Sequence, residues 1–242
     1  MLGCYSLGMK IFLTLCLLSI SVSADVIETV VSPASGLWGL GAKVKASPYV
    51  EADLEYSVAP YIFGSYGFLN IEANRADITL YGNGLVFASV VGQYRSQEAR
   101  KESSPYGERK AALELGGQVG LVLPASFVLR ASYLWDLSNA HNGSELDVQL
   151  FRHDGWGDLF LLTSVGLQYQ SKKLTNYYYA YENYEPREAL SAELELIVTY
   201  KIGDYGLFLG SRNYFYGSEI TNSPIVDKAY NLQLFSGIGY QF

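Results

Sequence analysis

Two histidines are the residues of this chain best suited to general-base chemistry near neutral pH. Hydrolases of the nucleophilic type place a histidine within hydrogen-bond reach of a serine or a carboxylate. His153 precedes Asp154, but adjacent residues of a strand point to opposite faces, which favours an ordinary histidine at the rim of the fold. His141 lies in an Asn-Ala-His-Asn-Gly run that is typical of a turn. We therefore expect no catalytic residues, and an enzyme would require one of these two histidines.

Cysteine chemistry is confined to the beginning of the chain. Cys4 and Cys16 are the two cysteines, and both lie within the first 24 residues. The remainder could form neither a disulfide, nor a thiolate metal site, nor a cysteine nucleophile. Two histidines also argue against a histidine-rich metal site. The sequence thus predicts no metal and no cofactor.

The first 24 residues have the layout of an export signal. Lys10 supplies a positive charge, residues 11–20 form an apolar run, and Val22-Ser23-Ala24 places small residues at a cleavage site. The run is too short to span a bilayer as a helix. Leu15 stands before Cys16 where a lipoprotein signal has a small residue, which disfavours lipidation. We expect a signal peptide over residues 1–24 and one domain over residues 25–242.

The charge and composition of the mature chain limit its partners. Removing the leader takes away Lys10 and leaves 16 basic against 24 acidic residues, a net charge of −8, which argues against nucleic acid. The chain is rich in tyrosine (21) and glycine (24), and after the leader it has no apolar run of the roughly 20 residues that a membrane helix needs. These features fit a transmembrane β-barrel in contact with outer-membrane lipid, where only alternate residues meet the lipid.

Alternation with period two recurs along the whole mature chain. In residues 112–123 apolar side chains occupy the odd positions, and in residues 232–242 they occupy the even positions and end on Phe242. A bacterial outer-membrane barrel needs a closing strand with an aromatic residue at the membrane boundary. A periplasmic sandwich or a lipocalin-like barrel is the soluble alternative. The repetition favours an all-β, transmembrane antiparallel barrel.

The number of strands follows from parity, because both ends of such a barrel normally lie in the periplasm. Residues 68–81 could form one strand or two, and reading them as one gives an even count of twelve. This count places the charged loop at residues 95–110 on the periplasmic side, with the loops 184–188 and 217–227 outside. The expected strands are residues 36–46, 57–63, 68–81, 85–94, 112–123, 127–135, 145–152, 159–170, 174–181, 191–201, 205–216 and 232–242.

If the apolar faces meet lipid, a set of charged side chains must point into the lumen: Glu114, Arg130, Asp136, Glu193, Glu195 and Arg212. Charges removed from bulk water tend to pair. They could plug a narrow barrel or line a pore, and pairing is favoured because a barrel of this size leaves little room for water. The tyrosines are expected to form girdles at the headgroup level, rather than a sugar-binding platform.

Several local runs resemble the MipA/OmpV family, the MltA-interacting outer-membrane proteins. They are Leu37-Trp38-Gly39-Leu40-Gly41, Ala112-Leu113-Glu114-Leu115-Gly116, His141-Asn142-Gly143, Ser223-Pro224-Ile225-Val226 and Gly237-Ile238-Gly239-Tyr240-Gln241-Phe242. Their order covers essentially the whole mature chain. The Tyr177-Tyr178-Tyr179-Ala180-Tyr181 run departs from the commoner pattern of the family.

The resemblance implies a non-enzymatic barrel in the bacterial outer membrane. It also implies a scaffold for murein remodelling, linking a periplasmic lytic transglycosylase to a murein synthase. It supplies no catalytic motif. A porin-like channel for small solutes and a protein of adhesion or stress response are the alternatives.

Overall fold

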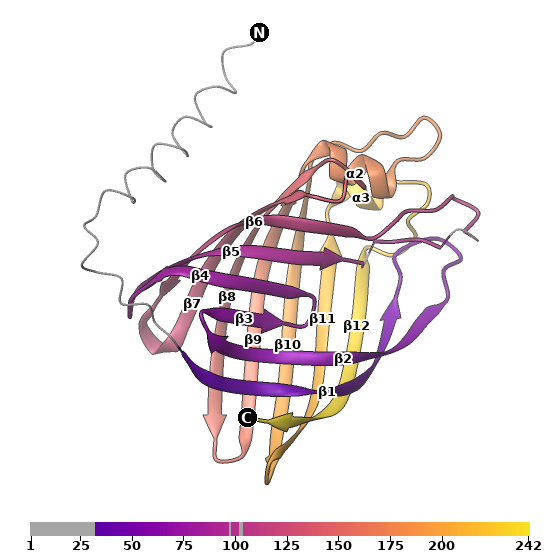
Figure 1. The fold of residues 1–242 in the computed structure, drawn as a ribbon. Coiled ribbons are helices and arrows are strands. Elements are labelled where there is room, and N and C mark those ends of the chain that lie inside the picture. The colour runs from indigo at the N-terminus through magenta and orange to yellow at the C-terminus, as the bar shows by residue number, and fades with distance from the viewer. Residues whose placement is uncertain (1–31, 97, 102–103) are drawn as a thin grey trace, which may run out of the picture.

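The computed structural model describes residues 32–96, 98–101 and 104–242, so the expected signal peptide lies outside the described residues. The described residues form twelve antiparallel strands in a closed barrel (Figure 1). Each strand pairs with the next one along the chain, and β12 pairs with β1 to close the wall. The strands are β1 (Ser32–Ala46), β2 (Leu54–Gly67), β3 (Leu69–Glu72), β4 (Arg75–Gly82), β5 (Val86–Arg95), β6 (Ala112–Val122), β7 (Phe127–Asp136), β8 (Ser144–Trp156), β9 (Leu159–Gln170), β10 (Ala189–Ile202), β11 (Tyr205–Tyr216) and β12 (Tyr230–Gln241).

The outer face of the wall is apolar and the inner face is polar. In β10, Leu194 and Leu196 are 42% and 41% exposed, whereas Glu193 and Glu195, which alternate with them, are buried. This arrangement is the reverse of a water-soluble barrel and is what lipid requires of a spanning sheet. The expected transmembrane antiparallel fold is confirmed. None of the described helices is long and apolar enough to cross a membrane.

Exposed aromatic side chains ring both ends of the barrel, as the girdle prediction requires. At one end Trp38 packs against Tyr240 with ring centroids 6.5 Å apart, and Tyr205 lies 6.1 Å from Tyr240. The other end carries the exposed rings of Tyr56, Tyr94, Trp135, Tyr169, Phe215 and Tyr230.

The two ends of the barrel differ in their connections. At the end where β12 terminates, which we call the turn end, the strands are joined by residues 68, 83–85, 123–126, 157–158 and 203–204; residues 124–126 form η1 (Pro124–Ser126). At the opposite end, the loop end, lie the longer segments 47–53, 96–111, 137–143, 171–188 and 217–229 (Figure 1). Outer-membrane barrels keep short turns in the periplasm and longer loops outside, so we expect the loop end to lie on the cell surface.

The expected count of twelve strands is right, but only because two errors offset each other: one expected strand is two strands, and another is a helix. Residues 68–81 form two strands, because Ala73 adopts a positive φ of 54° and turns β3 back into β4. Residues 174–181, expected as a strand, instead lie mostly in the helix α2 (Lys172–Tyr179). The segment 95–110 therefore lies at the loop end, together with 184–188 and 217–227. The prediction that it lies at the opposite end of the barrel from those two loops was wrong.

Candidate functional site

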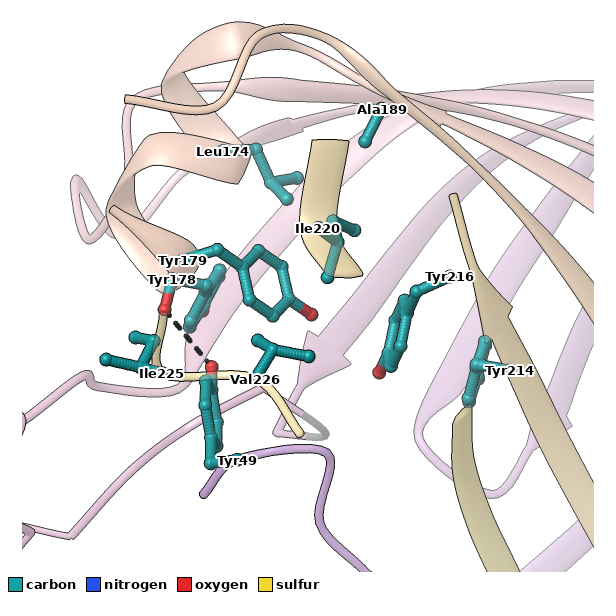
Figure 2. Packing of buried hydrophobic residues seen from close by; sticks show 10 residues of the cluster. All are labelled: Tyr49, Leu174, Tyr178, Tyr179, Ala189, Tyr214, Tyr216, Ile220, Ile225 and Val226. Carbon is teal, nitrogen blue, oxygen red and sulfur yellow. Dashed lines mark hydrogen bonds between the residues drawn. The ribbon is translucent and has the colours of Figure 1, made fainter. Parts of the chain in front are cut away.

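An aromatic and aliphatic cluster fills the lumen at the loop end (Figure 2). We call it the aromatic plug. Its members come from the loop after β1, from α2, from the start of β10, from β11 and from the segment containing α3 (Ser218–Thr221). All of them are buried: Tyr49, Leu174, Tyr178, Tyr179, Ala189, Tyr214, Tyr216, Ile220, Ile225 and Val226. Segments far apart in the sequence thus meet in one core inside the barrel.

Helix α2 carries much of the plug because its apolar residues follow a helical spacing. Leu174 and Tyr178, four residues apart, lie on the face that is fully buried. The hydroxyl of Tyr49 donates to the carbonyl oxygen of Glu98 at 2.7 Å. It also lies 3.3 Å from the carbonyl oxygen of Tyr178 (Figure 2). Ser223 Oγ donates to the carbonyl of Tyr179 at 2.6 Å. The bonds to Tyr178 and Tyr179 satisfy carbonyl groups that the end of α2 would leave without a partner.

A buried ion cluster lies next to the plug. Arg95 Nε is 2.8 Å from Glu114 Oε1, Arg95 Nη2 is 2.9 Å from Glu145 Oε2, and Nη1 is 3.6 Å from Glu98 Oε1. His141 Nε2 lies 3.1 Å from Glu114 Oε1. These five side chains, which we call the Arg95 cluster, are at most 1% exposed. The cluster and the plug together close the lumen toward the loop end.

The charges of the Arg95 cluster are unequal, with one guanidinium facing three carboxyl groups. The N–H of Gly143 donates to His141 Nδ1 at 3.0 Å, so the ring proton is on Nε2 and is donated to Glu114. Burial raises the pKa of the Glu98 carboxyl to about 7, although the nearby Arg95 opposes the shift. Glu98 therefore has a raised proton affinity, which relieves part of the repulsion among the acids.

The middle of the lumen holds further ion pairs. Arg75 Nη1 is 3.4 Å from Asp147 Oδ2, and Arg130 Nη1 is 2.9 Å from Glu72 Oε2. Arg212 Nε lies 2.8 Å from Glu195 Oε1 and 3.4 Å from Glu193 Oε1. Pairing of the inward charges is thus confirmed for five of the six residues that the sequence pointed to: Glu114, Arg130, Glu193, Glu195 and Arg212.

Asp136, the sixth expected lumen charge, has a different role. Its carboxylate accepts the backbone N–H groups of Ser138, His141 and Asn142 at 2.7–2.8 Å and thereby shapes the 137–143 loop. His141 was expected to serve only this turn, yet its ring reaches into the Arg95 cluster. Arg212 and its two glutamate partners were all expected, whereas Glu72, the partner of Arg130, was not. Glu72 and Arg75 flank the turn that was read as strand interior.

Beneath the ion pairs, the lumen contains a cavity of about 910 Å³. Arg130, Arg212 and Glu195 line its inner part, and Lys201, Asp204 and Phe242 line it at the turn end. The aromatic side chains of Phe63, Phe87, Phe151, Phe160 and Phe208 also line it. The barrel is therefore hollow on the side of the short turns and filled on the side of the loops.

The second histidine lines this cavity. The ring of His153 packs against Phe151 with centroids 5.7 Å apart, while Asp154 forms an ion pair with Arg152. His153 and Asp154 both line the cavity, close to the turn at 157–158. Among the described residues, no group of three or more His, Cys, Asp or Glu side chains could hold a metal ion.

Comparison with known proteins gives matches over most of the chain. Residues 38–242 match the family model described as "MltA-interacting protein MipA". The MltA-interacting protein of Escherichia coli is 27% identical over 241 residues, covering 88% of this chain and 93% of the relative. The outer membrane protein Omp26La of Vibrio anguillarum is 26% identical and OmpV of Vibrio cholerae 27% identical, each over 179 residues that cover 70% of this chain and 68% of the relative.

Proposed function

The chain belongs to the MipA family of outer-membrane barrels, and we propose that it is a non-enzymatic scaffold that holds murein-remodelling enzymes at the periplasmic face of the outer membrane. A relative named for its interaction with MltA supports the choice of partner, a periplasmic lytic transglycosylase. A murein synthase is the second enzyme of such an assembly.

The closure of the lumen carries this proposal. A passive channel needs a continuous aqueous path, and the aromatic plug and the Arg95 cluster occupy that path with buried side chains. The cavity of about 910 Å³ lies on the periplasmic side of this closure, so the barrel presents a recess and a ring of short turns to periplasmic proteins. A barrel built this way is better suited to binding than to conduction.

The position of the loops changes which surface should bind. The segment 95–110 lies at the loop end. With that end on the cell surface, as the general layout of outer-membrane barrels favours, a periplasmic enzyme could not reach it. The binding surface that remains consists of the turns at residues 83–85, 123–126, 157–158 and 203–204, together with the end of β12. Two acidic side chains, Asp158 and Asp204, are exposed on these turns.

Crosslinking in intact cells tests the proposal. A photoreactive residue at position 158 or 204 should capture a lytic transglycosylase, and the same residue at position 108 of the loop end should not. Capture of no periplasmic enzyme from either turn would contradict the scaffold function. A catalytic role would need His153 or His141, and replacing both with alanine is expected to leave partner capture intact.

A further inference from the structure

The barrel wall is incomplete at one place near the loop end. Strands β3 and β4 are short, and their hairpin turns at residues 73–74, well below the loop-side end of β2 (Figure 1). The pairing between β2 and β3 begins at Phe63↔Glu72 and runs toward the turn end. In the described part of the chain, no strand pairs with β2 above this point on the side away from β1. We call this gap beside residues 54–62 the wall notch.

The backbone direction shows which residues face the notch. Ala73 N donates to the carbonyl of Ile62 at 2.9 Å, so the polar groups of Ile62 point to the β3 side. Because these groups alternate along a strand, those of Pro60, Val58 and Tyr56 point the same way. Proline has no N–H, and within sheets it is confined to edge strands, to the first residue of a strand and to bulges. The position of Pro60, whose nitrogen points to the β3 side, is therefore consistent with an unpaired edge of β2.

The side chains on this edge are unusually exposed. Val58 and Tyr56 are 78% and 77% exposed, the highest fractions among the large hydrophobic side chains that the structure describes. Both point away from the lumen, as the exposed Leu54 and Ile62 on the same face do. The open edge thus has an apolar flank that faces the membrane. Unpaired backbone groups are costly there, because hydrocarbon cannot hydrogen-bond to them.

A basic pocket of about 320 Å³ lies where the notch meets the loop end. Glu55 of β2 forms one side, and the 96–111 segment forms the other, where Arg100 and Arg109 pair through their backbones. Four basic residues line the pocket, Arg100, Lys101, Arg109 and Lys110, against two acidic ones, Glu55 and Glu108. Glu55 is engaged by Lys45 at 3.0 Å. The guanidinium of Arg100 lies over the ring of Tyr49, and Arg109 donates to the carbonyl of Tyr177. The exposed positive charge of the pocket therefore comes from Lys101 and Lys110.

We propose that the wall notch binds a phosphate-bearing lipid of the outer leaflet, with its phosphate in the basic pocket and its chains along Val58 and Tyr56. Lysine and arginine side chains form strong charge-assisted hydrogen bonds with phosphate oxygens. The ester and hydroxyl oxygens between a lipid's headgroup and its chains can accept the N–H groups of the open edge. A lipid carries the phosphate, the hydrogen-bond acceptors and the apolar chains in one molecule, at the depth where the notch lies.

Binding of lipid A to the full barrel in detergent tests this site. Replacing Lys101 and Lys110, both exposed, in the variant K101Q/K110Q is expected to weaken lipid A binding about tenfold or more. The matched control K172Q/K173Q removes the same charge from α2 at the same end of the barrel and should retain wild-type affinity. Native mass spectrometry of the folded barrel measures the bound lipid and shows that both variants are folded.

The arms of the experiment separate the possible outcomes. Equal losses in the two variants would mean general charge attraction and overturn the site, as would the absence of any bound lipid A. A titration with inorganic phosphate identifies the source of the phosphate. Displacement of lipid A by an equal concentration of inorganic phosphate would overturn the lipid proposal, and persistence of the bound lipid supports it.

Discussion

Arg95 Nε lies 2.8 Å from Glu114 Oε1, so the last residue of β5 is tied to the third residue of β6 inside the wall. The same guanidinium reaches Glu145 of β8 and the loop residue Glu98. One side chain thereby joins three strands to the 96–111 segment directly beside the aromatic plug. Most of the measurable consequences of the closed lumen depend on this residue.

Replacing Arg95 with alanine is expected to destabilise the barrel by about 3 kcal/mol or more, because it leaves buried carboxylates without a counter-charge. The free energy of unfolding in urea, measured in detergent micelles, reports the change. Arg152→Ala is the control: its pair with Asp154 lies near the turn end and is partly exposed, so the cost should stay below about 1 kcal/mol. Equal costs would contradict a central role for Arg95.

The raised pKa of Glu98 predicts a defined dependence of stability on pH. An acid with a higher pKa in the folded state contributes stability below its ordinary pKa of 4.5, and this contribution is lost as the pH rises to about 7. Glu98→Gln lacks the titrating group, so its stability relative to wild type should increase between pH 4.5 and 7. Unfolding curves at several pH values measure the difference. A difference that stays constant over this range would show that Glu98 titrates normally.

Electrical recordings test the closed lumen. The wild-type barrel in a planar bilayer is expected to show no steady ohmic conductance. Removing two large rings in Tyr178→Ala/Tyr179→Ala should loosen the aromatic plug and produce openings, whereas Tyr56→Ala on the outer face should leave the barrel silent. Steady conductance of the wild type would contradict the closure and revive the channel alternative.

The assignment of the two ends can be checked with single cysteines, since both native cysteines lie within residues 1–24, the segment expected to be removed as a signal peptide. Glu108→Cys places a thiol at the loop end and Asp158→Cys places one at the turn end, and both positions are exposed. A membrane-impermeant maleimide should label position 108 on intact cells and position 158 only after the outer membrane is permeabilised. The opposite pattern would reverse the barrel and place the 96–111 segment in the periplasm.

The sequence predicts the wall of this barrel far better than its interior. Period-two alternation identifies the strands, because lipid on one side and a polar lumen on the other impose it on each residue. It does not separate β3 from β4, since a two-residue turn within residues 68–81 barely interrupts the pattern. It also mistakes α2 for a strand, because the four tyrosines and the alanine of residues 177–181 provide too little polar contrast to distinguish a period of two from 3.6.

The aromatic plug and the assembly of the Arg95 cluster could not be predicted from the sequence for a related reason. Tyr49 and Glu98 are contributed by loops, and only the closed fold brings them together with Tyr178, 129 residues away from Tyr49. Charges on strands could be assigned to the lumen from alternation, whereas loop residues have no periodicity that indicates a direction. Local pattern therefore predicted Glu114 and Arg130 but not their surroundings.

Binding of a purified lytic transglycosylase to the reconstituted barrel tests the scaffold function most directly. We expect that reversing the charge at the turn end, in Asp158→Lys/Asp204→Lys, weakens binding about tenfold. Removing residues 104–107 from the loop end should leave the affinity unchanged. The opposite result, with binding insensitive to the turns and lost with the shortened loop, would contradict both the binding surface and the function proposed for this barrel.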